Sequence, residues 1–77
     1  MEEIDKIFES IGYKIKKENN GYIRYWQQEH YGDEISFKIT EKKVRKISRG
    51  LENPHPKYIT TEELKAIEQF YKVKGWL

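Results

Sequence analysis

ISFKIT, residues 35–40, is the stretch that decides the fold of this chain. Its apolar residues Ile35, Phe37 and Ile39 alternate with polar ones, a period of two that is typical of a β-strand with one buried face. A polar turn follows, and residues 43–48 form a second strand-like segment. The pattern therefore predicts an antiparallel hairpin built on this stretch.

A second hairpin is predicted immediately upstream. Tyr13 and Ile15 alternate with lysines, and Asn19-Asn20-Gly21 is a typical hairpin turn sequence. The chain then returns as another strand rich in aromatic and β-branched residues. We expect an antiparallel meander of four strands. Their approximate ranges are 13–18, 22–28, 34–40 and 43–48.

Two helices flank the predicted meander. Residues 2–11 carry one apolar stripe with helical spacing, and Gly12 is suited to end that helix. The stripe consists of Ile4, Ile7, Phe8 and Ile11. Residues 60–74 form the second predicted helix, in which Thr60 and Glu63 have the spacing of a capping box.

The sequence thus predicts a single α+β domain over residues 1–77, with the order α-β-β-β-β-α. We expect both helices to pack on one face of the sheet. Residues 49–59 contain Gly50, Pro54 and Pro56 and are expected to be irregular. The predicted core consists of Ile4, Ile7, Phe8, Ile11, Ile15, Ile35, Phe37, Ile39, Val44, Leu64, Ile67 and Tyr71.

The pairing of the first hairpin has two alternatives. If residues 19–21 form a type I turn with a glycine bulge, Ile15 lies opposite Tyr25, and Trp26 points away from the core. If Asn20-Gly21 is a two-residue type I′ turn, Ile15 lies opposite Trp26, and Trp26 joins the core. The two differ by one residue, which reverses the direction of every side chain on a strand.

We favour the first pairing, because the second directs Lys17 and Arg24 toward the helices. The face of the sheet without helices then gathers basic and aromatic side chains. The residues expected there are Lys14, Lys16, Tyr22, Arg24, Trp26, Lys38, Lys43 and Arg45. Lysine and arginine also protect ordinary exposed strands against edge pairing, so the basic residues alone do not define a site.

This face suggests two functions. Tyrosine, tryptophan and arginine are enriched at the energetic centres of protein interfaces, so we expect a protein-binding surface, extended by Tyr31 in the following loop. The alternative is binding of single-stranded nucleic acid, in which bases stack on aromatic rings and phosphates contact cations. Residues 13–49 hold ten basic and five acidic residues, although the whole chain has a net charge of only +2.

Other function classes find little support in the sequence. Cysteine is absent, and His30 and His55 lie in predicted loops without the spacing of metal ligands. We therefore expect no enzymatic activity, no cofactor and no metal. No apolar run reaches the ~18 residues of a membrane span, and the first ten residues lack a signal-peptide pattern. We expect a cytoplasmic monomer or homodimer without membrane contact.

The C-terminal segment ITTEELKAIEQFYKVKGWL, residues 59–77, resembles the ending of small uncharacterised accessory proteins of phages and prophages of Gram-positive bacteria. The similarity lies in the Thr-capped helical segment from Thr61 through Ala66-Ile67 and in the terminal Gly75-Trp76. The Ile11-Gly12-Tyr13 ending of the first helix is similar too. The resemblance implies a phage-encoded modulator or inhibitor of a host protein or defence system, or a small nucleic-acid binder, with no catalytic residues to transfer.

Overall fold

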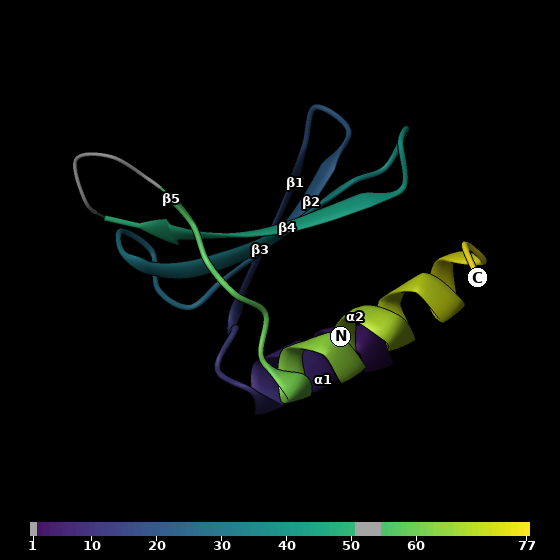
Figure 1. The fold of residues 1–77 in the computed structure, drawn as a ribbon, viewed down its shortest axis with the longest axis horizontal. Coiled ribbons are helices and arrows are strands. Elements are labelled where there is room, and N and C mark those ends of the chain that lie inside the picture. Colours follow the sequence, from purple (N-terminus) through teal and green to yellow (C-terminus); the bar gives the residue numbers. More distant parts are fainter. Residues whose placement is uncertain (1, 51–54) are drawn as a thin grey trace.

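The computed structural model describes residues 2–50 and 55–77 of the chain. It has an α+β fold in which a twisted antiparallel sheet lies on one side and both helices lie together on the other (Figure 1). The elements in chain order are α1 (Glu3–Ser10), β1 (Ile15–Asn19), β2 (Tyr22–Trp26), β3 (Gly32–Lys38), β4 (Lys43–Arg49), β5 (His55–Pro56) and α2 (Thr61–Lys74).

The sheet follows the predicted meander but has one more strand than expected. Its strand order is β1-β2-β3-β4-β5, and all neighbouring strands are antiparallel. β5 lies in the segment predicted to be irregular, where His55 pairs with Ser48 and Pro56 with Ile47. A proline fits here because β5 forms the edge of the sheet. Pro54 lies outside the described residues.

The core is a stack of aromatic rings between the sheet and the helices. The Phe8 ring of α1 stacks on Tyr25 with ring centres 4.0 Å apart, and the Phe70 ring of α2 stacks on Phe37 at 3.6 Å. Each helix is therefore held to the sheet by one stacked pair of aromatic rings. The buried hydrophobic residues are Ile4, Phe8, Tyr13, Ile23, Tyr25, Ile35, Phe37, Ala66, Ile67 and Phe70.

This core corrects part of the predicted one. Leu64 is 57% exposed, because the buried face of α2 runs through Ala66 and Phe70 instead. Ala66 is only 1% exposed, and the Phe70 ring on the same face of the helix stacks on Phe37. Ile15 also lies outside the core. The other predicted residues without full burial still pack against the core at its edges: Ile7, Ile11, Ile39, Val44 and Tyr71.

The favoured pairing of the first hairpin is wrong. Ile15 lies opposite Trp26, and Asn20 and Gly21 both have positive φ angles, of 49° and 78°, as a type I′ turn requires. Even so, Trp26 does not enter the core, because the one-residue shift reverses β1 and leaves β2 as expected.

The reason for this outcome lies in the central position of β2. Ile23 and Tyr25 are buried beneath the helices, so the direction of the β2 side chains is fixed by the core. β1 is an edge strand with little apolar content and follows the turn geometry. As a result, Lys17 lies on the face away from the helices, whereas Lys16 points toward them and its Nζ lies 3.1 Å from Oδ1 of Asp5.

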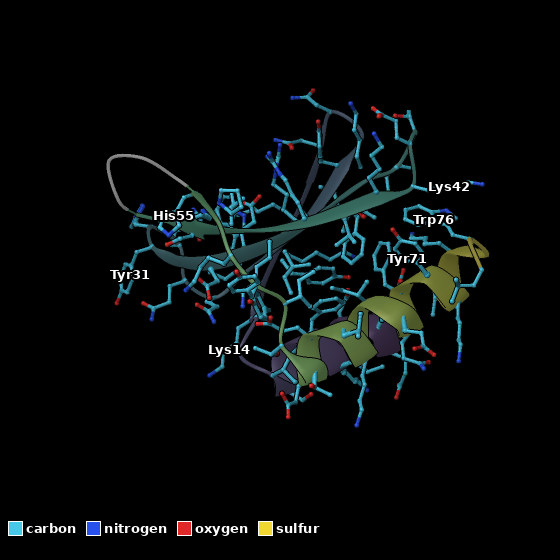
Figure 2. All side chains as sticks on the ribbon, viewed as in Figure 1. Lys14, Tyr31, Lys42, His55, Tyr71 and Trp76 are labelled. Carbon is cyan, nitrogen blue, oxygen red and sulfur yellow. The ribbon has the colours of Figure 1, made fainter. Side chains whose placement is uncertain are left out.

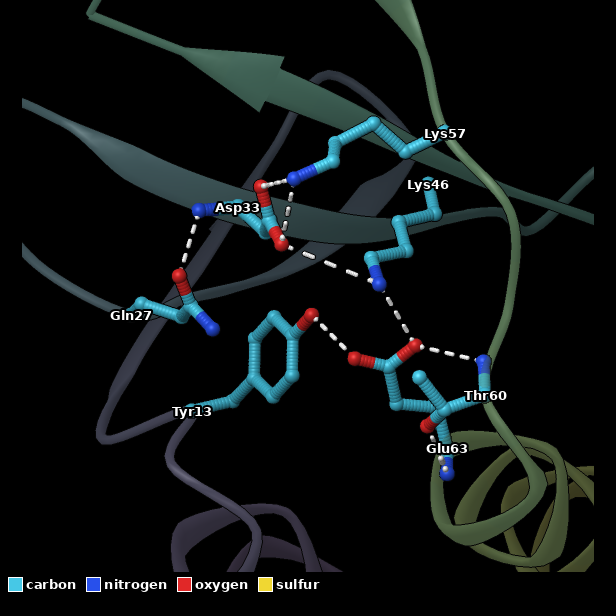
Figure 3. A network of polar contacts seen from close by, with 7 residues as sticks. All are labelled: Tyr13, Gln27, Asp33, Lys46, Lys57, Thr60 and Glu63. Carbon is cyan, nitrogen blue, oxygen red and sulfur yellow. Dashed lines mark hydrogen bonds and ion pairs between the residues drawn. The ribbon is translucent and has the colours of Figure 1, made fainter.

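A buried polar cluster fixes the start of α2 to the sheet (Figure 3). Glu63 is only 7% exposed, and its Oε1 accepts a hydrogen bond of 2.7 Å from Nζ of Lys46, which is also 7% exposed. The Tyr13 hydroxyl donates to Oε2 at 2.7 Å. The predicted capping box is confirmed: the Thr60 amide donates to Glu63, and the Glu63 amide donates to the Thr60 hydroxyl.

The cluster continues through Asp33 on β3. Nζ of Lys46 lies 3.7 Å from one of its carboxylate oxygens, and Nζ of Lys57 lies 3.1 Å from the other (Figure 3). Burial favours the neutral form of Glu63, but hydrogen bonds from Lys46, Thr60 and Tyr13 outweigh it and lower the pKa of this carboxyl. Burial and the neighbouring Glu63 both raise the pKa of the Tyr13 hydroxyl.

We predict that Glu63→Gln lowers the free energy of unfolding by about 3 kcal/mol, because it leaves the buried Lys46 without its closest counter-charge. Glu62→Gln is the matched control, since Glu62 is exposed in the same helical turn and should cost less than about 1 kcal/mol. Urea denaturation of both variants measures the difference. Equal losses would contradict the assigned role of Glu63.

The lowered pKa of Glu63 also predicts a pH dependence. A carboxyl whose pKa is lower in the folded state than its ordinary 4.5 stabilises the fold above that pH, and the stabilisation is lost as the pH falls through the folded value. Hence the stability difference between the wild type and Glu63→Gln should shrink below about pH 4.5. Urea denaturation at pH 7, 5 and 3 tests this, and a constant difference would argue against it.

Candidate functional site

The strand register defines a surface that we call the open face, the side of the sheet turned away from α1 and α2. Side chains alternate between the two faces along a strand, and directly paired residues share a face. The open face therefore consists of Ile15, Lys17, Asn19, Tyr22, Arg24, Trp26, Glu34, Ser36, Lys38, Lys43, Arg45, Ile47 and Arg49.

Most of the residues predicted for this surface are brought together on it. Tyr22, Arg24 and Trp26 follow one another along β2, and Lys38 lies directly beside Tyr22 on β3. Arg45 lies one strand further, on β4. β2, β3 and β4 are inner strands of the sheet. The buried residues that alternate with these side chains along each strand therefore fix the face to which they point.

Lys14 and Lys16 are corrections to the predicted site. Lys16 forms its ion pair with Asp5 of α1, and Lys14 is exposed beside the same helix, away from the open face (Figure 2). The type I′ turn causes both corrections, because its register directs each β1 side chain to the face opposite to the expected one. The same turn brings Lys17 onto the open face. The Asn20-Gly21 pair favours a type I′ turn, and this sequence signal could have placed Lys17 on the open face.

Trp26 is half-buried at one end of the open face, with cations over its ring. The Arg49 guanidinium carbon lies 3.6 Å from the ring centre, and Nζ of Lys17 lies 5.5 Å from it. The indole N–H donates a hydrogen bond of 2.9 Å to Glu34. The ring is therefore held in one orientation by its polar edge and by a stacked guanidinium.

Arg49 connects this ring to the loop between β2 and β3. Its guanidinium donates to the backbone carbonyls of Gln28 and Glu29, at 3.0 and 2.9 Å. Tyr31 lies further along the same loop and is 57% exposed (Figure 2). A methyl group added to Gly50 would come within 2.4 Å of Cβ of Tyr31, so the loop and the end of β4 are in close contact. The loop is thus fixed against the sheet by contacts from both residues.

A pocket of about 280 Å³ lies at the other end of the open face, where β3 turns into β4. One wall is the Tyr22 ring, which has the Arg24 guanidinium 4.7 Å from its centre. The residues that line the pocket are Tyr22, Ser36, Lys38, Glu41, Lys43, Val44 and Arg45. The pocket is therefore both aromatic and strongly basic.

The charge of the open face is clearly positive. Its basic residues are Lys17, Arg24, Lys38, Lys43, Arg45 and Arg49. Among the described residues assigned to this face, the one carboxylate is Glu34, which lies 3.9 Å from Arg24 and 3.6 Å from Arg49. Glu41 adds a second carboxylate from the turn after β3. This surface can attract negatively charged groups and present two fixed aromatic rings to them.

Metal binding and membrane crossing are two further properties that bear on the kind of site. Within residues 2–50 and 55–77, no group of three histidine, aspartate or glutamate side chains is arranged to hold a metal ion. In the same part of the chain, no helix combines the length and apolar character that crossing a bilayer requires.

Comparisons with known proteins identify no relative: no family model, no curated protein and no solved structure matches this chain.

Proposed function

We propose that this protein is a small, non-enzymatic binding module that holds an acidic surface of a partner protein on its open face. The observation that carries the proposal is the arrangement around Trp26, in which Arg49, Lys17 and Glu34 fix the ring on a basic surface. Following the resemblance to phage accessory proteins, we propose a host protein as that partner and a modulating or inhibitory effect on it.

The fixed geometry favours a protein partner because rigid aromatic and arginine side chains lose little entropy on binding. Arg24 is positioned by the Tyr22 ring and Arg49 by two backbone carbonyls, so both guanidinium groups are ordered before a partner arrives. Ile15 and Ile47 are half-buried on the same face, Ile15 directly opposite Trp26 and Ile47 beyond Glu34 on β4, and both provide apolar surface. An aromatic anchor with charged groups around it resembles the usual composition of a binding hot spot.

Single-stranded nucleic acid remains the alternative, and the ring contacts disfavour it. A base stacks on the face of an aromatic ring. Here a guanidinium already lies over Trp26 and another over Tyr22, at 3.6 and 4.7 Å from the ring centres. Displacing them would cost the cation–π contact at each ring. An acidic protein surface needs no free ring face and is attracted by the positive charge of these groups where they lie.

We predict that the acidic peptide Ac-Asp-Glu-Phe-Asp-Glu-Leu-NH2 binds about tenfold more tightly at 50 mM salt than its counterpart with asparagine and glutamine, and more weakly as salt rises. The double variant Lys17→Met/Arg24→Met should lose most of this preference. Lys6→Met/Lys65→Met, which removes the same charge from exposed positions on the helices, should keep it. Chemical shifts in NMR titrations give both the affinity and the place of binding.

Two outcomes would contradict the proposed function. One is an equal loss of affinity in the two double variants, because binding would then depend on net charge and not on the open face. The other is tighter binding of unstructured oligothymidine, dT8, than of the acidic peptide under the same conditions, which would favour the nucleic-acid alternative.

A further inference from the structure

The pocket beside Tyr22 contains an arginine with unused donors. Nε of Arg45 donates to the hydroxyl of Ser36 at 3.3 Å, and Ser36 is only 2% exposed. This contact anchors one edge of the guanidinium to the sheet. Among the described residues, Arg45 forms no ion pair, so its two terminal amino groups remain available to a ligand. An arginine anchored in this way can bind an oxyanion with two parallel hydrogen bonds.

The two lysines of the pocket already hold a carboxylate. Glu41 forms an ion pair with Lys38 and another with Lys43, whose Nζ is 3.0 Å from a Glu41 oxygen. Hydrogen bonds from both lysines lower the pKa of Glu41. The two ammonium groups thus converge on one oxyanion at the rim of the pocket. An incoming anion with more charge can compete with Glu41 for them.

The turn that carries Glu41 has a defined shape. Lys42 adopts a left-handed conformation with φ of 55°, and its carbonyl accepts a hydrogen bond of 2.8 Å from the Tyr71 hydroxyl of α2. Figure 2 shows Tyr71 and Trp76 close to the turn at Lys42. The backbone of the turn at the rim of the pocket is therefore supported by the helix layer.

The charges in the pocket match a dianion. Three cations face one carboxylate, which leaves a charge of +2 among the lining residues. A phosphomonoester carries about −1.5 to −2 at pH 7, whereas an aspartate or glutamate side chain carries −1 and a nucleic-acid diester also carries −1. We propose that this pocket binds a phosphomonoester on a side chain of the partner protein. The class of partner rests on the proposed function; the preference for phosphate does not.

Three peptides that differ at one position test the inference. They have the sequence Ac-Asp-Glu-Xaa-Phe-Asp-Glu-NH2, in which Xaa is serine, glutamate or phosphoserine. We expect the phosphoserine peptide to bind about tenfold more tightly than the glutamate peptide, with the largest amide shifts at Lys38, Lys43 and Arg45. Equal affinities for the two peptides would overturn the inference.

Variants test whether the pocket is the source of the preference for phosphoserine over glutamate. Arg45→Met and Lys43→Met should each remove most of the difference between phosphoserine and glutamate, whereas Lys14→Met, which removes a charge beside α1, should keep it. Glu41→Gln should strengthen phosphopeptide binding, because it frees both lysines. An NMR spectrum of each variant serves as the control that the sheet is intact. A preference unchanged in both pocket variants would overturn the assignment.

The outcomes also separate this inference from the proposed function. If acidic peptides bind the open face but phosphate adds nothing, the pocket inference fails and the proposed function stands. If the phosphoserine peptide binds while the glutamate and serine peptides do not, the pocket inference stands and the acidic-surface proposal fails. If 5′-phosphorylated dT8 binds more tightly than the phosphopeptide, the inference that the phosphate belongs to a protein side chain is overturned.

Discussion

Burial of Ile23 and Tyr25 beneath the two helices is the constraint on which the rest of this structure depends. The Tyr25 ring stacks on Phe8, and its hydroxyl donates to Asp5 at 2.8 Å, so α1 and β2 are joined by both apolar and polar contacts. Since side chains alternate along a strand, these two residues direct the remaining side chains of β2 to the open face. The same packing therefore produces the core and exposes the surface that we propose for binding.

Much of the fold could be predicted from local patterns. The strand pattern in 35–40 and the capping box at Thr60 each depend on a few neighbouring residues. The capping box was found as expected, whereas the strand covers Gly32–Lys38 and buries Ser36 as well as Ile35 and Phe37. Burial of charged residues could not be predicted in this way. Lys46 and Glu63 lie on different elements and are stable inside because they pair with each other and with Asp33, Tyr13 and Thr60, a relation that no local pattern reveals.

The predicted site shows the same division. The β2 side chains lie on the expected face of the sheet, because the buried residues of a central strand fix its direction. The part on β1 was wrong because an edge strand takes its direction from the turn, and one residue of register exchanged Lys16 for Lys17 on the open face. The pocket depends on the β3–β4 pairing, which aligns Lys38 with Lys43, and on the anchoring of Arg45 by Ser36. Arg49 was missed because its contact with Trp26 bridges strands that are not neighbours.

The position of the Trp26 indole follows from all of these constraints together, and it can be measured directly. Nuclear Overhauser contacts of the indole protons report which side of the sheet the ring occupies. We expect contacts to the side chains of Ile15 and Arg49, which share the open face with Trp26. Contacts from the indole to the rings of Phe8 or Phe37 would place it under the helices and contradict the proposed binding surface.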